Sequence, residues 1–269
     1  MTSGALLFAR YAYPASALGY CGPAKPRELL EHVAAGADDR ELRHLARAFE
    51  DDWLYLELLA SAAGIGDPLD ARVVEAYWIG SPLLDKVDRC SMAGSMERRF
   101  RVPAGRAWPA LMDAVSAGAL PHHSFHVLGI YPLLGLGVGP GPGLGLGPGL
   151  GLGPDAVAQE PLHVLDRCRI RWGQVVEIAG ERAIVRSRPL CWDGRSLELG
   201  EPRLEEVVVA RDGLALVAGL GIGDWCSLHW EWICDRISAR QLRALQTYTL
   251  RQLRVINGLP FSLTASVQR

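Results

Sequence analysis

Apolar residues in the first half of the chain recur at spacings of three and four, the period of an amphipathic α-helix. The longest run extends from Asp39 to about Ala62, with acidic residues near its start, where the helix dipole favours them, and Gly64 after its end. Shorter runs predict further helices over residues 24–36, 67–80, 81–96 and 108–117. The pattern therefore predicts a bundle of about five helices.

Beyond residue 159 the pattern changes to short β-branched segments that partly alternate between apolar and polar residues, as half-buried strands do. Strands are predicted over residues 167–178, 182–188, 205–210 and 224–233, and a hairpin over residues 190–199. Ser238 and Gln241 form a capping box that opens a final helix, which ends at Asn257-Gly258. Short strands followed by one helix predict a small barrel of about 95 residues.

A glycine-rich segment separates these two regions. Glycine occupies every odd position from Gly135 to Gly153, interleaved with leucine, valine and proline. A strict period of two cannot supply the G-x-G-x-x-G spacing of a dinucleotide-binding loop, so the segment is interpreted as a low-complexity linker. The sequence thus predicts an α+β protein with a helical domain (1–134), a linker (135–158) and a barrel with a C-terminal helix (159–269).

Composition narrows the function classes. The 269 residues are 49% hydrophobic and 22% charged, which is typical of a globular protein. A net charge of −2 does not favour a nucleic-acid or membrane-surface partner, because both need a clustered positive field. No signal peptide or membrane span is recognised, so we expect a cytoplasmic protein whose six dispersed cysteines are free thiols. The common catalytic motifs are absent, and we therefore expect no enzyme.

Histidines and aromatic residues supply further candidate sites. His122, His123 and His126 cluster, and a helix starting at Pro121 would place the first and last on one face, where they could bind a metal. The residues that follow look extended, so we expect a solvated or hydrogen-bonded loop instead. Four residues of the first segment either pack the first helices or meet a partner: Tyr11, Tyr13, Tyr20 and Cys21.

Several motifs beyond the linker resemble a known family. Cys168-Arg-Ile-Arg-Trp-Gly-Gln-Val is followed by Gly180-Glu-Arg-Ala-Ile-Val, and Gly223-Asp-Trp-Cys-Ser-Leu-His is followed by Arg236-Ile-Ser before the last helix. In this order they are similar to the landmarks of the HypC/HupF-type nickel–iron hydrogenase maturation chaperones, over about residues 163–257. The N-terminal stretch FARYAYPASALGYCGP is similar to uncharacterised bacterial proteins, which carry no activity over to this chain.

The resemblance implies an OB-like barrel and a carrier role. Such chaperones hold no permanent cofactor; together with a maturation scaffold protein they carry an Fe(CN)2(CO) fragment to the precursor of the hydrogenase large subunit. The iron-binding cysteine corresponds to Cys168, and the histidine beside it to His229. A soft thiolate and an imidazole are suitable donors for low-spin iron. The resemblance therefore predicts an accessory protein that acts through protein contacts and transient iron binding.

Three departures from the family keep a second interpretation open. Cys168 does not follow an initiator methionine, Trp172 replaces the family's proline, and the segment from Pro189 to Gly221 is longer. In the second interpretation, Cys168 is an ordinary half-buried thiol and His229 is a packed strand residue. The barrel is then a metal-free structural or regulatory interaction module.

Strand alternation suggests where a partner would bind. If residues 224–233 form one strand, Trp225 and His229 share a face, and Trp230 and Trp232 lie on the opposite, core face. We therefore expect an exposed docking patch of Trp225, His229 and Trp172. Cys226 and His229 are three apart in this strand and would form a poor chelate.

Overall fold

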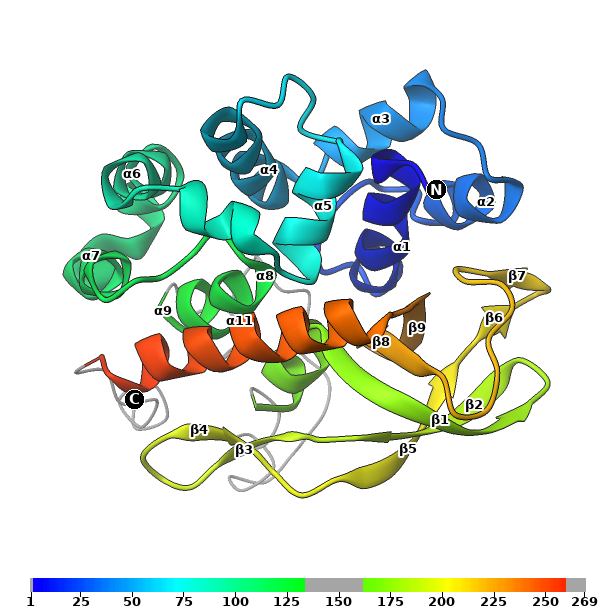
Figure 1. Cartoon of the computed structure of the whole chain (residues 1–269). Coiled ribbons are helices and arrows are strands. Elements are labelled where there is room, and N and C mark those ends of the chain that lie inside the picture. Colours follow the sequence, from blue (N-terminus) through cyan, green and yellow to red (C-terminus); the bar gives the residue numbers. More distant parts are fainter. Residues whose placement is uncertain (1, 134–161, 260–269) are drawn as a thin grey trace.

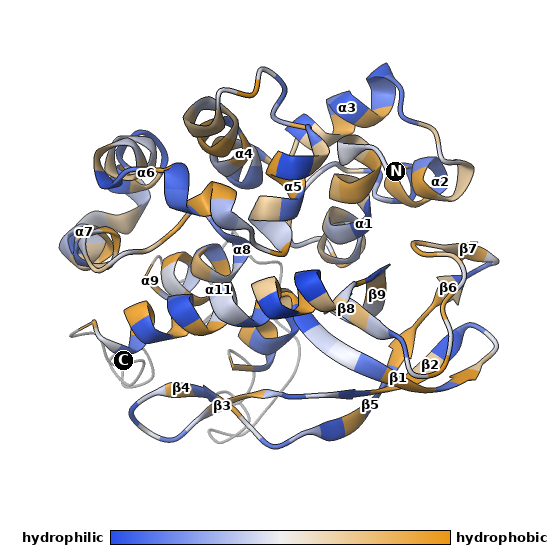
Figure 2. Ribbon diagram, viewed as in Figure 1, coloured by the Kyte–Doolittle hydropathy of each residue, from blue (hydrophilic) through white to orange (hydrophobic). Residues whose placement is uncertain are grey.

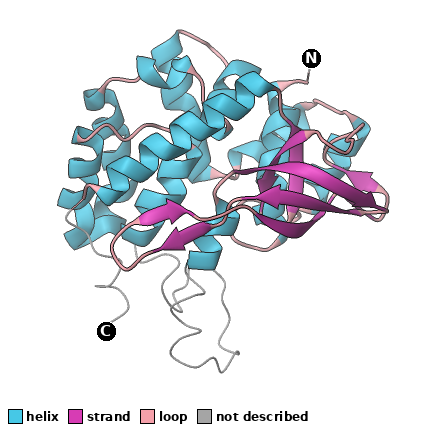
Figure 3. Cartoon of the chain, turned by 60° about the horizontal axis from the view of Figure 1, so that its bottom comes forward, coloured by secondary structure: helices cyan, strands magenta, loops and turns pink. Residues whose placement is uncertain are grey.

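The computed structural model describes residues 2–133 and 162–259, which form a mixed helical and sheet structure. Helices occupy the N-terminal half, strands dominate the C-terminal half, and one long helix follows them (Figures 1 and 3). This general arrangement confirms the prediction from the sequence pattern. The predicted linker, residues 135–158, lies outside the described residues. No helix in the described ranges combines the length and the apolar character needed to cross a bilayer.

The helical half begins with seven α-helices and two short 3₁₀ turns. Their bounds are α1 Gly4–Ala17, α2 Arg27–Ala35, α3 Arg40–Arg47, α4 Glu50–Ala63, α5 Ala71–Trp78, η1 Pro82–Lys86, α6 Arg89–Ala104, η2 Gly105–Ala107 and α7 Trp108–Ser116. The run predicted as one helix from Asp39 to about Ala62 is in fact two, α3 and α4. Phe49 interrupts it because its buried ring turns inward, with an edge-on contact to Phe8.

Helix α1 was not predicted, because Pro14 lies inside it and apolar residues occur all around it. Eleven of its fourteen residues are buried, so tertiary packing rather than an amphipathic pattern stabilises it. Tyr11 shows why: its ring stacks on Trp78 of α5, and its hydroxyl lies 2.8 Å from Ser227 Oγ in β8. Helix α1 therefore packs against α5 on one side and against β8 and β9 on the other (Figure 1).

The segment after α7 is helical, where the sequence suggested a loop. It consists of α8 (His123–Phe125), a π-helical turn η3 (His126–Ile130) and α9 (Tyr131–Leu133), all largely buried. A further helix covers residues 162–168, so the strand predicted from residue 167 begins only at Arg171. Cys168 consequently lies at the end of a helix rather than at the start of a strand.

Five strands form the main sheet: β1 Arg171–Ala179, β2 Arg182–Ser187, β5 Arg203–Val208, β8 Trp225–His229 and β9 Trp232–Arg236. Their order, β1-β2-β5-β9-β8, closes on itself because β8 pairs back with β1. Two hairpins extend from it, β3–β4 (Leu190–Trp192, Leu197–Leu199) and β6–β7 (Ala210–Arg211, Leu214–Ala215). The strand predicted over residues 224–233 is thus two strands, joined by a tight turn in which Trp230 has a φ of 52°.

The last helix, α11 (Ala239–Asn257), begins with the predicted capping box of Ser238 and Gln241. Apolar and polar residues alternate along it (Figure 2), and its buried side faces the helical half. One continuous hydrophobic core includes Phe8 and Trp78 from the helices, Trp232 from the sheet, and Leu245 from α11. The helical and strand-rich regions therefore share a core, and the sheet buries a smaller second cluster of its own, which includes Val185, Val207 and Leu228.

Candidate metal centre

Cys168, His229 and His123 meet at the junction of the helical and strand-rich regions. Cys168 ends the helix over residues 162–168, His229 ends β8, and His123 begins α8. One ligand atom from each, the Cys168 Sγ and one ring nitrogen of each histidine, lies within 4.8 Å of the other two. All three side chains are buried, at 6%, 1% and 3% exposure respectively. The family resemblance pairs Cys168 with His229, whereas His123 is recognised in the sequence only as part of a histidine cluster.

The hydrogen bonds of His229 leave one of its ring nitrogens free. Nδ1 lies 2.5 Å from the backbone carbonyl oxygen of Tyr11, which can only accept, so Nδ1 carries the proton and donates. The Nε2 atom then has a lone pair, and among the described residues it has no hydrogen-bond partner. Burial lowers the pKa of His229 to about 4, so the ring is neutral at neutral pH. A neutral imidazole with one nitrogen held by a carbonyl is the usual state of a metal ligand.

His123 is held at both ring nitrogens. Nε2 lies 3.0 Å from the backbone carbonyl oxygen of Cys168, and Nδ1 lies 3.2 Å from the hydroxyl of Tyr77. Tyr77 in turn donates a short hydrogen bond to Oδ1 of the buried Asp52. Burial first, and then the nearby His229 and His126, lower the pKa of His123 well below its ordinary value. This ring is therefore also neutral and is oriented by a tyrosine–aspartate pair.

A small cavity lies between these side chains. It has a volume of about 20 Å³, which is room for a single water or ion. Burial, with the charge of Asp52 as a smaller cause, raises the pKa of the Cys168 thiol, so a metal must displace its proton. A more open cleft of about 220 Å³ adjoins the cavity. The same four residues line both spaces and form the wall between them: Tyr20, Cys21, Asp52 and Tyr131.

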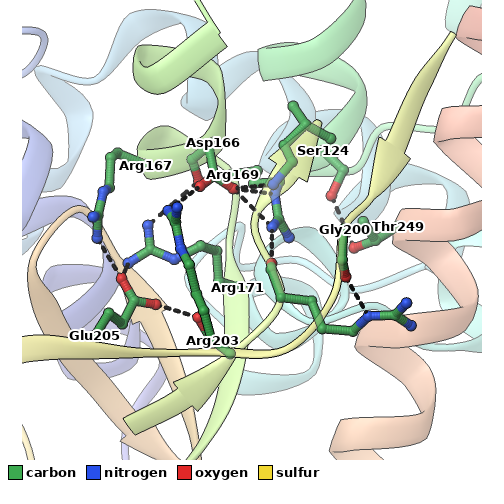
Figure 4. Close-up of polar contacts among 12 residues, drawn as sticks. Ser124, Asp166, Arg167, Arg169, Arg171, Gly200, Arg203, Glu205 and Thr249 are labelled. Atoms are coloured by element: carbon green, nitrogen blue, oxygen red, sulfur yellow. Dashed lines mark hydrogen bonds and ion pairs between the residues drawn. The ribbon is translucent and has the colours of Figure 1, made fainter. Parts of the chain in front are cut away.

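A buried charge network fixes the chain on both sides of Cys168 (Figure 4). The carboxylate of Asp166 accepts hydrogen bonds from Arg169, at 2.8 and 3.1 Å, and from the backbone N–H of Leu190, at 2.8 Å. Arg171 donates to the Trp230 carbonyl at 2.6 Å and lies 3.4 Å from Glu205. Asp166 and Arg169 thus hold the residues before and after the cysteine in place.

Comparison with known proteins adds a family but no activity. The model of a family of unknown function, DUF6390, matches residues 1–262. This chain belongs to the DUF6390 family. A comparison with curated proteins found no match, and a comparison with solved structures found none. The DUF6390 match spans both the helical and the strand-rich regions, so all three residues at the cavity lie within one family unit.

The prediction of an exposed docking patch on this DUF6390 chain is wrong. Trp172 and His229 are buried, and Trp225 is half-buried. Strand alternation predicted which side chains share a face of the strand, but it could not show whether that face is exposed. In the structure, α1 covers β8 and β9. Trp230 and Trp232 are core residues as predicted; they contact the rings of Tyr20 and Tyr13.

The rest of the histidine cluster has other roles. His122 accepts a hydrogen bond from the Ser124 backbone N–H and caps α8. His126 Nδ1 lies 3.6 Å from Asp52, and its ring contacts Tyr131 edge-on. The metal pair considered for His122 and His126 does not form, because the two rings have different neighbours.

Two parts of this site were not predicted from the sequence. The contribution of His123 depends on packing between distant segments, and three histidines within five residues were its one signal. The burial of the charge network had no signal. Arg167, Arg169 and Arg171 occupy alternate positions in a stretch predicted as a half-buried strand, where a polar row is expected to face solvent, whereas Arg169 and Arg171 are buried.

Proposed function

We propose that this protein is an accessory factor in the assembly of a nickel–iron hydrogenase. In this role it holds an iron fragment transiently at Cys168 and His229 and delivers it, through contacts with a maturation scaffold protein, to the large-subunit precursor. The observation that carries the proposal is the convergence of these two side chains: the resemblance paired them, and their ligand atoms lie within 4.8 Å in the folded chain.

The surroundings of the two residues support this role. A thiolate and a neutral imidazole are the donor types suited to low-spin iron, and a two-residue protein site leaves positions for the fragment's own ligands. The closed strand order β1-β2-β5-β9-β8, followed by α11, is the arrangement expected of an OB-like barrel with a closing helix. These features agree with the HypC-like interpretation of residues 163–257.

The size of the cavity adds a requirement. At about 20 Å³ it accepts one ion, whereas Fe(CN)2(CO) carries three diatomic ligands and needs more space. Loading therefore requires the wall between cavity and cleft to move. Two of its residues, Tyr20 and Cys21, belong to the loop between α1 and α2, and a movement of this loop would separate the stacked rings of Tyr20 and Trp230.

The second candidate is a metal-free interaction module. The observation that favours it is the burial of Trp172 and His229 in a closed core, where both side chains have a packing role. In that case the protein binds the hydrogenase precursor or the scaffold without carrying iron.

Infrared spectroscopy distinguishes the two candidates. The full chain is co-expressed with the maturation scaffold and purified, and the nitrile and carbonyl stretching bands of the iron fragment are recorded. We expect both bands in the wild type, their loss in Cys168→Ala, and their retention in Cys226→Ala, which removes a buried thiol outside the cavity. A complex without bands supports the interaction module, and bands unchanged by Cys168→Ala refute the proposed function.

A further inference from the structure

We infer that His123 is a third metal donor, so that Cys168, His229 and His123 form one sulfur–nitrogen–nitrogen site for a divalent first-row transition metal. This inference deepens the proposed function and rests on it for the role of Cys168 and His229. Its new element is that the helical half, which the hydrogenase chaperone resemblance does not cover, supplies a ligand.

One ring nitrogen of His229 has no hydrogen-bond partner among the described residues. Buried polar atoms without a partner destabilise the fold, because they have lost their hydrogen bonds to water. The Nε2 atom of His229 is one of these, and His229 lines the cavity together with Cys168 and His123. A metal ion in the cavity would satisfy its lone pair.

The neighbours of His123 decide which of its ring nitrogens could bind a metal. Nε2 of His123 lies 3.0 Å from the Cys168 carbonyl oxygen, which can only accept, so this nitrogen carries the proton and donates. For Nε2 to bind a metal, this hydrogen bond must break and the proton must move to Nδ1, where the Tyr77 hydroxyl, 3.2 Å away, can accept it while Tyr77 donates to Asp52. With a metal bound, Tyr77 and Asp52 would then act on His123 as the Tyr11 carbonyl acts on His229, holding one nitrogen protonated and leaving the other for the metal.

The charges and the donor spacing at the cavity also suit a divalent cation. A divalent cation bound to one thiolate keeps a single positive charge, which the carboxylate of Asp52, another residue of the cavity wall, can balance. Donor atoms of a tetrahedral zinc-type site lie about 3.5 Å apart, as follows from metal–ligand bonds of roughly 2.0–2.3 Å. The present separations of up to 4.8 Å therefore need to contract by roughly 1 Å, within the reach of side-chain rotation.

The donor set also defines the class of metal. One thiolate and two imidazoles favour Zn²⁺, Fe²⁺ or Co²⁺ over Mg²⁺ and Ca²⁺, which prefer oxygen ligands. Three protein donors leave a fourth position open, as in sites that exchange a ligand. The cavity of about 20 Å³ has room for the ion itself, so an additional ligand would have to enter from the adjoining cleft.

Cobalt(II) titration of the reduced full chain tests the site, because Co²⁺ reports its ligands by absorption. We expect one Co²⁺ per chain, with a thiolate-to-cobalt charge-transfer band that Cys168→Ser abolishes. His123→Ala should weaken Co²⁺ binding at least about tenfold, and Tyr77→Phe should weaken it by less without changing the spectrum. His123→Cys should bind Co²⁺ with a stronger charge-transfer band, because it supplies a second thiolate. Circular dichroism verifies that each variant is folded.

Two matched variants serve as controls. His122→Asn changes a neighbouring buried histidine, and Cys226→Ser a buried thiol elsewhere; both should bind Co²⁺ as the wild type does. Wild-type affinity in folded His123→Ala, or no Co²⁺ binding by the wild type, overturns the inference. If His123→Ala binds normally while Cys168→Ala loses the infrared bands, the inference fails and the proposed function stands. If Co²⁺ binds as expected and no bands appear, the proposed function fails alone.

Discussion

The charge network beside Cys168 offers a sharp test of how the candidate site is held. The carboxylate of Asp166, 5% exposed, is bonded to Arg169, which is 1% exposed, and also accepts the Leu190 N–H. Asp166→Ala therefore leaves a guanidinium buried without its counter-ion and a backbone donor without an acceptor. Arg169 keeps a hydrogen bond of 2.7 Å to the Arg188 carbonyl, which provides no charge.

The magnitude follows from the burial. Breaking a buried ion pair on one side costs about 3–5 kcal/mol, and the orphaned N–H adds to the upper end of this range. We expect Asp166→Ala to lower the free energy of unfolding by about 4 kcal/mol, a large share of the roughly 5–15 kcal/mol of a typical protein. For a chain of this size the unfolding midpoint should fall by roughly 10 °C.

Equilibrium unfolding in urea, monitored by tryptophan fluorescence, measures this loss in the free energy of unfolding. The matched control is Glu206→Ala, which breaks the exposed Arg182–Glu206 pair on neighbouring strands, with an N–O distance of 3.5 Å. Exposed pairs contribute about 0–1 kcal/mol, so this variant should resemble the wild type. A loss below about 1 kcal/mol in Asp166→Ala would refute the view that Asp166 compensates a buried charge.

Two further predictions concern pH and thiol reactivity. Burial lowers the pKa of three histidines in the folded chain to about 4. Below pH 6.5 the unfolded chain therefore binds more protons than the folded chain. The free energy of unfolding should fall between pH 6.5 and pH 4, by about 3 kcal/mol for each histidine. The three are His122, His126 and His229. Asp52, whose pKa burial raises to about 7, opposes this trend by about the amount of one histidine. Urea midpoints with EDTA between pH 7.5 and 4.5 test the prediction; a flat profile contradicts it, and the exposed His44→Asn should change nothing. The second prediction is that a thiol reagent modifies the exposed Cys90 and Cys191 at once and Cys168 only after unfolding; rapid labelling of Cys168 would show that its cavity is open.

Local signals in the sequence predicted local structure well. Gly36 ends α2 in the left-handed conformation, with a φ of 65°, and Ser238 and Gln241 form their reciprocal cap. In both cases the backbone groups that need partners lie within a few residues of the side chains concerned. The predictions that failed depended on distant residues. The break at Phe49 requires Phe8, and the turn at Trp230 places its ring on Tyr20.

The same distinction applies to the site. Cys168 and His229 were paired through a resemblance that extends over one continuous region, in which the spacing of motifs is informative. His123 belongs to the other half, and no periodicity relates residue 123 to residues 168 and 229. The exposure of His229 could not be predicted either, because strand alternation cannot reveal that α1 covers the face that carries this residue.

The contact between the Tyr11 carbonyl and His229 has a practical consequence for dissecting the protein. A fragment that begins near residue 159 retains every motif shared with the hydrogenase chaperones, yet it lacks both the acceptor that fixes the tautomer of His229 and the imidazole of His123. Such a fragment would also expose Trp232, which rests against Tyr13 in the intact chain. Biochemical work on the strand-rich region should therefore begin with the intact polypeptide, or with both portions produced together.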